Sequence, residues 1–203
     1  VPLILDYPGN PDRGRRIDHP ITLCDVAPTL AGRLAPALTL PLELPPVPFA
    51  GTDLVAALRA SHTNPELLAE RPIFAEIDLW FFPPETRRLD GRRIVAVEGF
   101  AGFTFDAKTW AIYLDAPHQP HSILAKHRMV LQGDKKLLYI PTRDGVRWEL
   151  YAPLEDPGDL VDLAATEPQT TARLAETLWS WMLRDPLVER RGDFLVPRLA
   201  RSR

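Results

Sequence analysis

RMVLQGDKKLLYIPTRDGVRWELY, residues 128–151, decides the fold of the C-terminal part of this chain. It contains three short runs rich in β-branched and aromatic residues, separated by two turn pairs, Gly133-Asp134 and Asp144-Gly145. The runs span residues 128–132, 136–140 and 147–151. Glycine and aspartate tolerate the backbone conformations of tight hairpin turns. Successive short strands joined by such turns predict an antiparallel sheet.

The same pattern extends in both directions from this stretch. Further strands are expected over residues 73–79, 94–99 and 110–114. Downstream, Thr166 and Gln169 fit a capping box that starts a helix reaching about Leu183. Its apolar face consists of Leu174, Ala175, Leu178, Trp181 and Met182. We expect this face to cover one side of the sheet, and the basic tail of residues 189–203 to be loosely held.

The N-terminal part of the chain has a different character. Residues 1–7 include a continuous apolar run, which is typical of a strand buried on both faces. Asp25 is a candidate N-cap for a helix to Leu34, and Thr52 for a short helix after it. Between these helices, residues 36–48 contain five prolines and predict a linker.

These patterns predict an α/β fold in two parts. Residues 1–70 are expected to form the end of a large mixed sheet, a strand plus a helix. Residues 71–203 are expected to form a small antiparallel subdomain packed by the C-terminal helix. A strand buried on both faces needs neighbouring strands and covering layers. We therefore expect the chain to be a piece of a larger protein.

Composition excludes several classes of function. The formal net charge is −3, with no basic surface signature for nucleic acid or anionic membrane. No apolar run approaches the ~20 residues that span a bilayer. Cys24 is the single cysteine, so neither an internal disulfide nor a cysteine zinc cluster is possible. Its neighbour Asp25 disfavours a reactive thiolate, and we expect Cys24 to be a small buried residue.

Candidate chemistry within the chain is sparse. His118 and His121 are the one histidine pair with a spacing that could suit a metal. However, Pro120 between them disfavours the helical geometry in which two such side chains converge on one ion, and the sequence has no further metal ligand nearby. Two solvated imidazoles on a loop explain the pair better. Ser61-His62 are adjacent in sequence, which does not by itself supply a nucleophile and base. The residues alone predict no catalytic site and no metal site.

An ordered set of segments nevertheless resembles the C-terminal portion of sulfatases, in the alkaline phosphatase superfamily. Residues 19–30, HPITLCDVAPTL, are similar to the pattern P-V-S-x-x-D-x-A-P-T-L of that family. Residues 149–159, ELYAPLEDPGD, resemble its E-L-Y-D-L-x-x-D-P-G-E, with Ala152 in place of Asp. Other segments that match in order are 1–9, 51–54, 71–76, 135–139 and 162–164.

The resemblance implies that the parent protein hydrolyses sulfuric esters. Sulfatases use a formylglycine nucleophile and a divalent cation, usually calcium, and the motifs that supply both lie upstream of the matching segments. Cys24 does not fit the nucleophile motif, because proline should follow two positions later. This chain is thus expected to complete the core and wall the substrate cleft, to lack catalytic residues and metal ligands, and to be inactive alone.

Residues 79–126 match no part of the family pattern. Since such an insertion could influence substrate choice, Trp80, His118 and His121 are the substrate-binding candidates for a sulfate or phosphate ester. Two alternatives stay open. The parent could be a phosphodiesterase or phosphonate monoester hydrolase of the same superfamily. The chain could instead be a non-catalytic module that binds a partner through a sheet edge or through exposed aromatics at 80–82.

Overall fold

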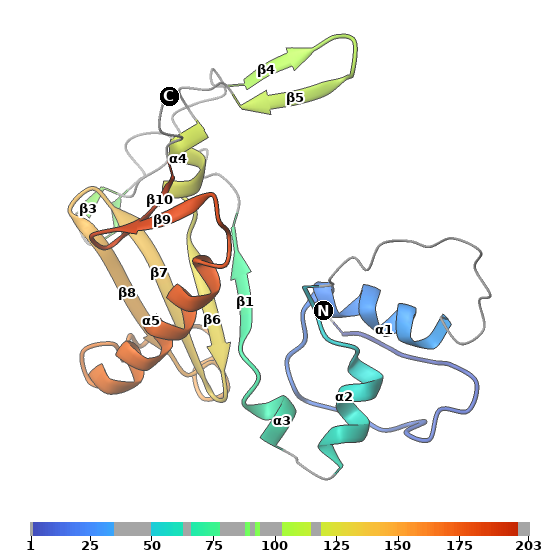
Figure 1. Ribbon diagram of the computed structural model, residues 1–203. Coiled ribbons are helices and arrows are strands. Elements are labelled where there is room, and N and C mark those ends of the chain that lie inside the picture. Colours follow the sequence, from blue (N-terminus) through green and yellow to red (C-terminus); the bar gives the residue numbers. More distant parts are fainter. Residues whose placement is uncertain are drawn as a thin grey trace. The chain divides into compact units, whose positions relative to one another are not determined.

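The computed structural model describes most of the chain and divides it into two compact units, Val1–Ala69 and Glu70–Arg203. The described residues are 2–34, 50–62, 66–77, 88–89, 92–93, 103–114 and 119–198. The fold class is α/β, as the sequence predicted (Figure 1). No helix among these residues is long and apolar enough to cross a membrane. The assignment of the first unit to a larger α/β core remains a prediction.

The first unit is built from short helices. A 3-10 turn, η1 (Leu23–Asp25), leads directly into α1 (Val26–Leu34), and α2 (Leu54–Ser61) and α3 (Glu66–Ala69) follow. The strand predicted over residues 1–7 is not formed in the described residues 2–7. A strand requires hydrogen bonds to a neighbouring strand, and the described part of this unit offers none.

The caps of these helices lie one to three residues away from their predicted positions. Thr22, not Asp25, is the N-cap of η1, and Asp25 is the third residue of a complete capping box. At α2 the N-cap is Asp53 rather than Thr52. Its Oδ1 accepts hydrogen bonds from the amides of Val55 and Ala56 at 3.0 and 3.2 Å.

The second unit contains the predicted antiparallel sheet, with strand order β1-β6-β7-β8. Its strands are β1 (Ile73–Glu76), β6 (Arg128–Gln132), β7 (Lys135–Thr142) and β8 (Gly145–Tyr151). The predicted turn residues explain its hairpins, since Gly133 and Gly145 both have positive φ, 61° and 129°. The strand predicted over 94–99 lies outside the described residues, and the one predicted over 110–114 corresponds to β5 (Ala111–Leu114).

Smaller elements complete this unit. They are β2 (Arg88–Leu89), β3 (Arg92–Arg93), β4 (Phe103–Asp106), α4 (Gln119–Leu124), α5 (Pro168–Met182), β9 (Val188–Arg191) and β10 (Phe194–Pro197). Pairs β2–β3, β4–β5 and β9–β10 each form a two-stranded antiparallel ladder. Helix α5 starts at Glu167 without a side-chain cap. The predicted cap, Thr166, instead donates its hydroxyl to the Leu163 carbonyl at 3.0 Å.

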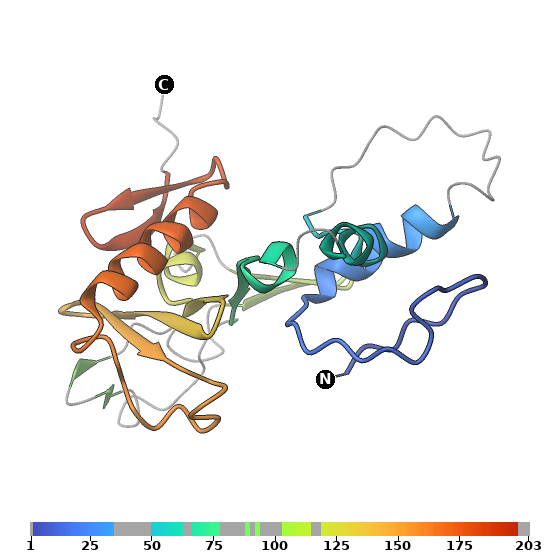
Figure 2. The same ribbon diagram turned by 90° about the horizontal axis from the view of Figure 1, so that it is seen from below.

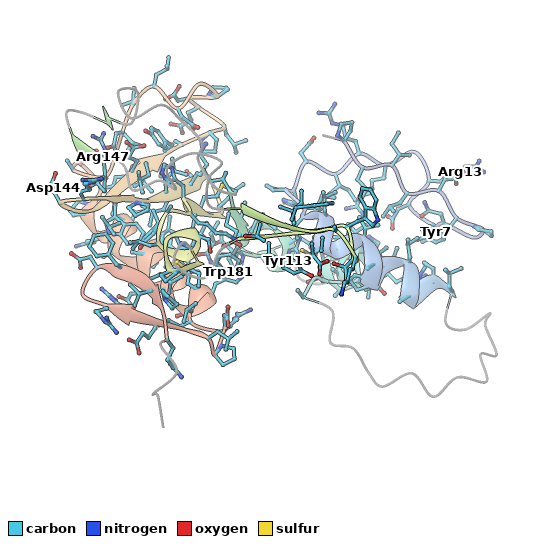
Figure 3. All side chains as sticks on the ribbon, turned by 90° about the horizontal axis from the view of Figure 1, so that it is seen from above. Tyr7, Arg13, Tyr113, Asp144, Arg147 and Trp181 are labelled. Carbon is cyan, nitrogen blue, oxygen red and sulfur yellow. The ribbon has the colours of Figure 1, made fainter. Side chains whose placement is uncertain are left out.

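Helix α5 lies along one face of the sheet and closes the core (Figures 1 and 2). The fully buried core side chains include Val130, Leu137, Tyr139, Leu150, Leu174 and Leu178. Trp181 of α5 stacks on Phe74 of β1, with ring centroids 4.9 Å apart (Figure 3). Of the predicted helix face, Leu174, Leu178 and Met182 are buried, and Ala175 and Trp181 pack against their edge.

The described part of the basic tail, residues 189–198, is ordered, contrary to the prediction. Residues 188–197 form the hairpin β9–β10, and Val188 and Leu195 are part of the core. The Leu195 amide donates to the phenolic oxygen of Tyr139 at 3.0 Å, inside the core. Charge composition alone did not reveal this, because alternating residues of the tail point to opposite faces and only one face is apolar.

We expect Tyr139→Phe to lower the free energy of unfolding of the second unit by about 1–2 kcal/mol, because the buried Leu195 amide loses its acceptor. Urea unfolding followed by far-UV circular dichroism measures the change. Tyr113→Phe is the control, since Tyr113 is exposed. Equal stability of the Tyr139→Phe protein and the wild type would show that the phenol does not hold the tail hairpin.

Candidate functional site

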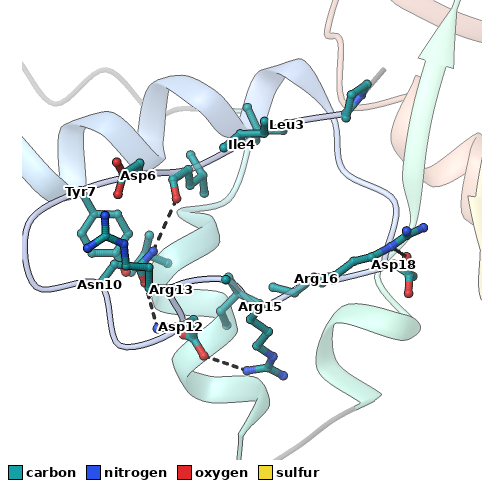
Figure 4. A pocket seen from close by; sticks show the side chains of 16 residues that line it. Leu3, Ile4, Asp6, Tyr7, Asn10, Asp12, Arg13, Arg15, Arg16 and Asp18 are labelled. Atoms are coloured by element: carbon teal, nitrogen blue, oxygen red, sulfur yellow. Dashed lines mark hydrogen bonds and ion pairs between the residues drawn. The ribbon is translucent and has the colours of Figure 1, made fainter.

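The concave surface of the first unit is a candidate for a ligand site. The loop before η1 and helix α2 enclose a hollow of about 820 Å³ (Figure 4). A second hollow of about 600 Å³ shares part of this lining and reaches His19, Ser61 and His62. Leu58 lines both, so each has an apolar floor and a polar rim.

Backbone turns shape the rim of the larger hollow. A turn follows at Pro8-Gly9, with Gly9 at φ 73° and the Asn10 amide donating to the Tyr7 carbonyl at 3.2 Å. The Asn10 side chain then accepts from the Asp12 amide at 3.0 Å. These hydrogen bonds fix the backbone conformation of the loop that lines the hollow.

The charges on this rim largely neutralise one another. Asp12 accepts from Arg15 Nη1 at 3.0 Å and lies 3.5 Å from His62 Nε2. Arg15 Nη1 is also 2.7 Å from His62 Nε2. Asp18 pairs with Arg16 at 2.8 Å. Three aspartates (Asp6, Asp12 and Asp18) and three arginines (Arg13, Arg15 and Arg16) line the hollow. Because the two signs are balanced, the hollow is not a strongly electropositive anion site.

No catalytic pair is assembled there. Ser61 donates its hydroxyl to the Leu58 carbonyl at 2.8 Å, which leaves no hydrogen bond from Ser61 to His62 in this geometry. No group of three or more metal-ligating side chains occurs among the described residues. The described residues therefore offer no ligand set for the calcium that the sulfatase resemblance implies.

The structure does not test the substrate-binding candidates from the sequence. Trp80 and His118 lie outside the described residues, and of His121 only the backbone, within α4, is described. Their predicted role remains untested. Cys24 was expected to be buried and is exposed. In the 3-10 turn η1 the side chain of Asp25 points into the protein, so that the side chain of the preceding residue, Cys24, points to solvent.

Asp25 and Thr29 form a buried polar joint, which sequence reasoning matched to a motif but did not interpret. The carboxylate of Asp25 accepts from the amides of Thr22 at 3.0 Å and Thr52 at 2.8 Å. Thr29 donates its hydroxyl to the Asp25 carbonyl at 2.6 Å and accepts from the Leu54 amide at 2.9 Å. Both side chains are buried, so the joint ties α1 to the start of α2.

A glycine makes this joint possible. A Cβ added to Gly51 would lie 2.0 Å from the Cys24 carbonyl oxygen, so that any other residue would force the two segments apart. Gly51 begins the segment that resembles the G-x-S-L pattern of sulfatases. Glycine is required at this position because the backbone at residue 51 packs directly against the backbone at Cys24.

A second buried polar cluster lies on β8. Glu149 is buried and accepts from Arg147 Nε at 2.7 Å and from the Tyr151 hydroxyl at 2.8 Å. Burial raises the pKa of Tyr151, and the Glu149 carboxylate raises it further. Asp162 accepts from the Leu150 amide at 3.0 Å and holds the following loop against the strand. The phenol therefore stays protonated and acts as a donor at neutral pH.

The titration of His127 makes the second unit sensitive to acid. Burial, and secondarily the Arg128 cation, lower the pKa of His127 to about 4 from 6.5. The unfolded chain then binds a proton that the folded chain does not, so stability falls as pH decreases from about 6.5 to about 4. We expect the urea midpoint to fall over this range and His127→Gln to flatten the profile.

The control for this pH profile is His62→Gln, which alters a histidine of the first unit. It should leave the pH dependence of the second unit unchanged. A His127→Gln protein with the wild-type slope between pH 6.5 and 4 would assign the acid sensitivity to other groups.

Comparison with known proteins finds no family model that matches the chain. Among solved structures, the chain is similar to the crystal structure of a phosphonate monoester hydrolase of Agrobacterium radiobacter. The alignment has 19% sequence identity and a TM-score of 0.48, and it covers 92% of this chain and 31% of that chain. The present chain therefore spans about a third of the length of that protein.

Proposed function

We propose that this chain is the C-terminal portion of a hydrolase of the alkaline phosphatase superfamily that cleaves a tetrahedral anionic ester, a sulfuric ester in the first instance. Its role is to complete the core of the parent enzyme and to wall one side of the substrate cleft. The nucleophile and the metal ligands belong to the upstream part of the parent. The sulfate chemistry rests on the sequence resemblance described above.

The observation that carries this proposal is an exposed apolar stripe on α1, made of Ala27, Leu30 and Leu34 and continued by Leu23 of the preceding turn η1. The three leucines are 85%, 51% and 51% exposed, whereas the opposite side of the helix holds the buried Asp25–Thr29 joint. Spacings of four, three and four residues place the stripe on one helix face. A helix with an apolar outer face requires another layer, which the proposed parent core supplies.

The residues at the motif positions support the same proposal. Asp25 and Thr29, in the first matching segment, join two helices, and Glu149 and Asp162, in the later ones, hold β8 and its following loop. Buried polar residues that satisfy backbone amides are costly to replace. If the parent enzyme and sulfatases share this structural framework, their sequences should resemble each other at these positions, although none of them is catalytic.

Chemistry requires groups beyond this chain. Hydrolysis of a sulfate ester needs an activated oxygen nucleophile and positive charge that stabilises the developing negative charge. When bound, a divalent cation would supply that charge from the upstream ligands. In this proposal the present chain contributes by positioning the sheet and helices that border the cleft.

The proposal is tested by assaying the gene's full-length product and the 203-residue chain in parallel. The substrates are an aryl sulfate, an aryl phosphonate monoester and a diaryl phosphodiester. We expect turnover by the full-length product, fastest with the sulfate, and none by the chain alone. Faster phosphonate or phosphodiester hydrolysis would replace the sulfatase proposal by the related phosphoesterase. Turnover by the chain alone would contradict the proposed division of roles.

The stripe yields a second prediction. In the isolated chain, Leu30→Glu should change stability by only about 0.5 kcal/mol, because the side chain is half exposed. In the full-length product it should abolish soluble expression or activity, because a charge would be buried unpaired. Thermal unfolding and yield measure both effects. Leu187→Glu, at another exposed leucine, is the control. If the full-length Leu30→Glu protein is as soluble and active as the wild type, the parent core does not pack against the α1 stripe.

A further inference from the structure

Strand β8 forms one edge of the four-stranded sheet. Among the described residues it pairs with β7 alone. In an antiparallel ladder, successive residues of a strand turn their amides and carbonyls alternately toward the neighbouring strand and away from it. An edge strand therefore presents a row of outward backbone groups, to which a strand of another chain can add. The sequence of β8, GVRWELY, contains the valine and aromatic residues that favour such pairing.

The outward backbone groups of Leu150 are bound by a segment of the same chain. The Leu150 amide donates to the carboxylate of Asp162 at 3.0 Å, and the Leu150 carbonyl accepts from the Leu163 amide at 2.7 Å. Both partners belong to the loop after β8. A residue of an added antiparallel strand would bind the same amide and the same carbonyl. The loop thus occupies the position of an added strand at Leu150.

Polar contacts hold this loop in its conformation. We call residues 156–163 the strap. The Asp156 carboxylate accepts from the amides of Leu160 at 2.6 Å and Val161 at 2.9 Å. The side chains of Leu160 and Val161 are 85% and 59% exposed, so burial of apolar surface contributes little in this part of the strap. Its conformation therefore depends on the carboxylates that bind its amides.

Two further aspartates attach the strap to the sheet. Asp159 has a φ of 52°, in the left-handed region that a residue other than glycine adopts at a cost, and its carboxylate pairs with Lys136 of β7. Asp162 Oδ1 accepts from the Ala164 amide at 2.9 Å as well as from the Leu150 amide. One oxygen of Asp162 therefore binds both the edge of the sheet and the end of the strap.

We propose that the strap is a built-in cover for the C-terminal end of the β8 edge. Asp162 holds it closed, and the closed strap prevents a strand of another copy of this chain from adding there. Leu150 is fully buried, so an open strap leaves its amide and carbonyl without their partners. An added strand supplies both partners again. This role of the strap does not depend on the proposed ester hydrolysis.

The test compares Asp162→Ala with Asp162→Asn in the full 203-residue chain. Asparagine keeps an oxygen acceptor at this position, whereas alanine has none. Hydrogen–deuterium exchange is measured at the Leu150 amide, and sedimentation velocity after prolonged incubation measures association. We expect exchange at Leu150 to be at least about tenfold faster in Asp162→Ala, and this variant to associate over time. Asp162→Asn should stay within about threefold of the wild-type exchange rate and should not associate.

Asp144→Ala is the matched control, because Asp144 is an exposed aspartate in the turn between β7 and β8. It should exchange and sediment as the wild type does. Unchanged exchange at the Leu150 amide in Asp162→Ala would overturn the role of the strap at this edge. Faster exchange without more association than in the wild type would overturn its role against strand addition.

A second variant keeps the proposal testable if Asp162→Ala does not fold. Asp156→Ala removes the acceptor of the Leu160 and Val161 amides and leaves the hydrogen bonds of the sheet in place. It should loosen the strap from its first residue, so that the Leu150 amide exchanges faster than in the wild type and the chain associates over time. Wild-type exchange at Leu150, or wild-type sedimentation, in a folded Asp156→Ala protein would contradict the proposal.

Discussion

Leu178→Ala should lower the free energy of unfolding of the second unit by about 3–4 kcal/mol. Leu178 is fully buried in the interface between α5 and the sheet, in one cluster with Leu137, Tyr139 and Leu150. Truncation removes the transfer free energy of three carbon groups and leaves a cavity among side chains from rigid strands. Urea unfolding monitored by tryptophan fluorescence measures this loss, because Trp148 and Trp179 both contact the Tyr139 ring.

The matched control is Glu176→Ala on the exposed face of the same helix. It retains helix propensity and removes no core contact, so its effect should stay within about 0.5 kcal/mol. A Leu178→Ala protein that unfolds at the wild-type urea midpoint would mean that α5 does not close the core as described.

Asp25→Ala should destabilise the first unit by about 3 kcal/mol, since buried amides lose a charged acceptor. The two amides are those of Thr22 and Thr52, at 3.0 and 2.8 Å from the carboxylate. Hydrogen–deuterium exchange at Thr52 reports the effect locally and does not require a separate unfolding transition of this unit. We expect faster exchange there and at Leu54, whose amide is bound by Thr29.

Asp25→Asn provides a graded comparison, because the amide keeps one oxygen acceptor and loses the charge. Its exchange rates should fall between those of the wild type and Asp25→Ala. Asp18→Ala, at an exposed carboxylate of the preceding loop, should have no effect at Thr52. Unchanged protection of Thr52 in Asp25→Ala would contradict the buried joint, and with it the structural account of the motif.

Much of the second unit was predictable from local signals. The three strands of residues 128–151 and their turns follow from β-branched runs punctuated by glycine and aspartate, and the structure has them nearly residue for residue. The face of α5 followed from helical spacing. Sequence periodicity suffices here because a half-buried sheet and helix each impose their own repeat on the apolar residues.

The first unit and the details of its site were less predictable. The apolar run of residues 2–7 indicated a strand, but strand formation depends on partners that local sequence does not contain. Cys24 was expected to be buried and is exposed, whereas its neighbour Asp25 is buried, because a shift of the helix start rotates neighbouring side chains by about 100°. The candidate substrate residues Trp80, His118 and His121 remain predictions.

The sequence by itself determined the α/β class, the antiparallel sheet, the helix that covers it and the ordered motifs behind the proposed hydrolase. Only the tertiary structure decided that Asp25 binds Thr52 and that Leu195 binds Tyr139. It also showed that the apolar stripe of α1 is exposed to solvent. The physical reason is range: periodicity and turn chemistry act between near neighbours, whereas these contacts and exposures depend on segments brought together by folding.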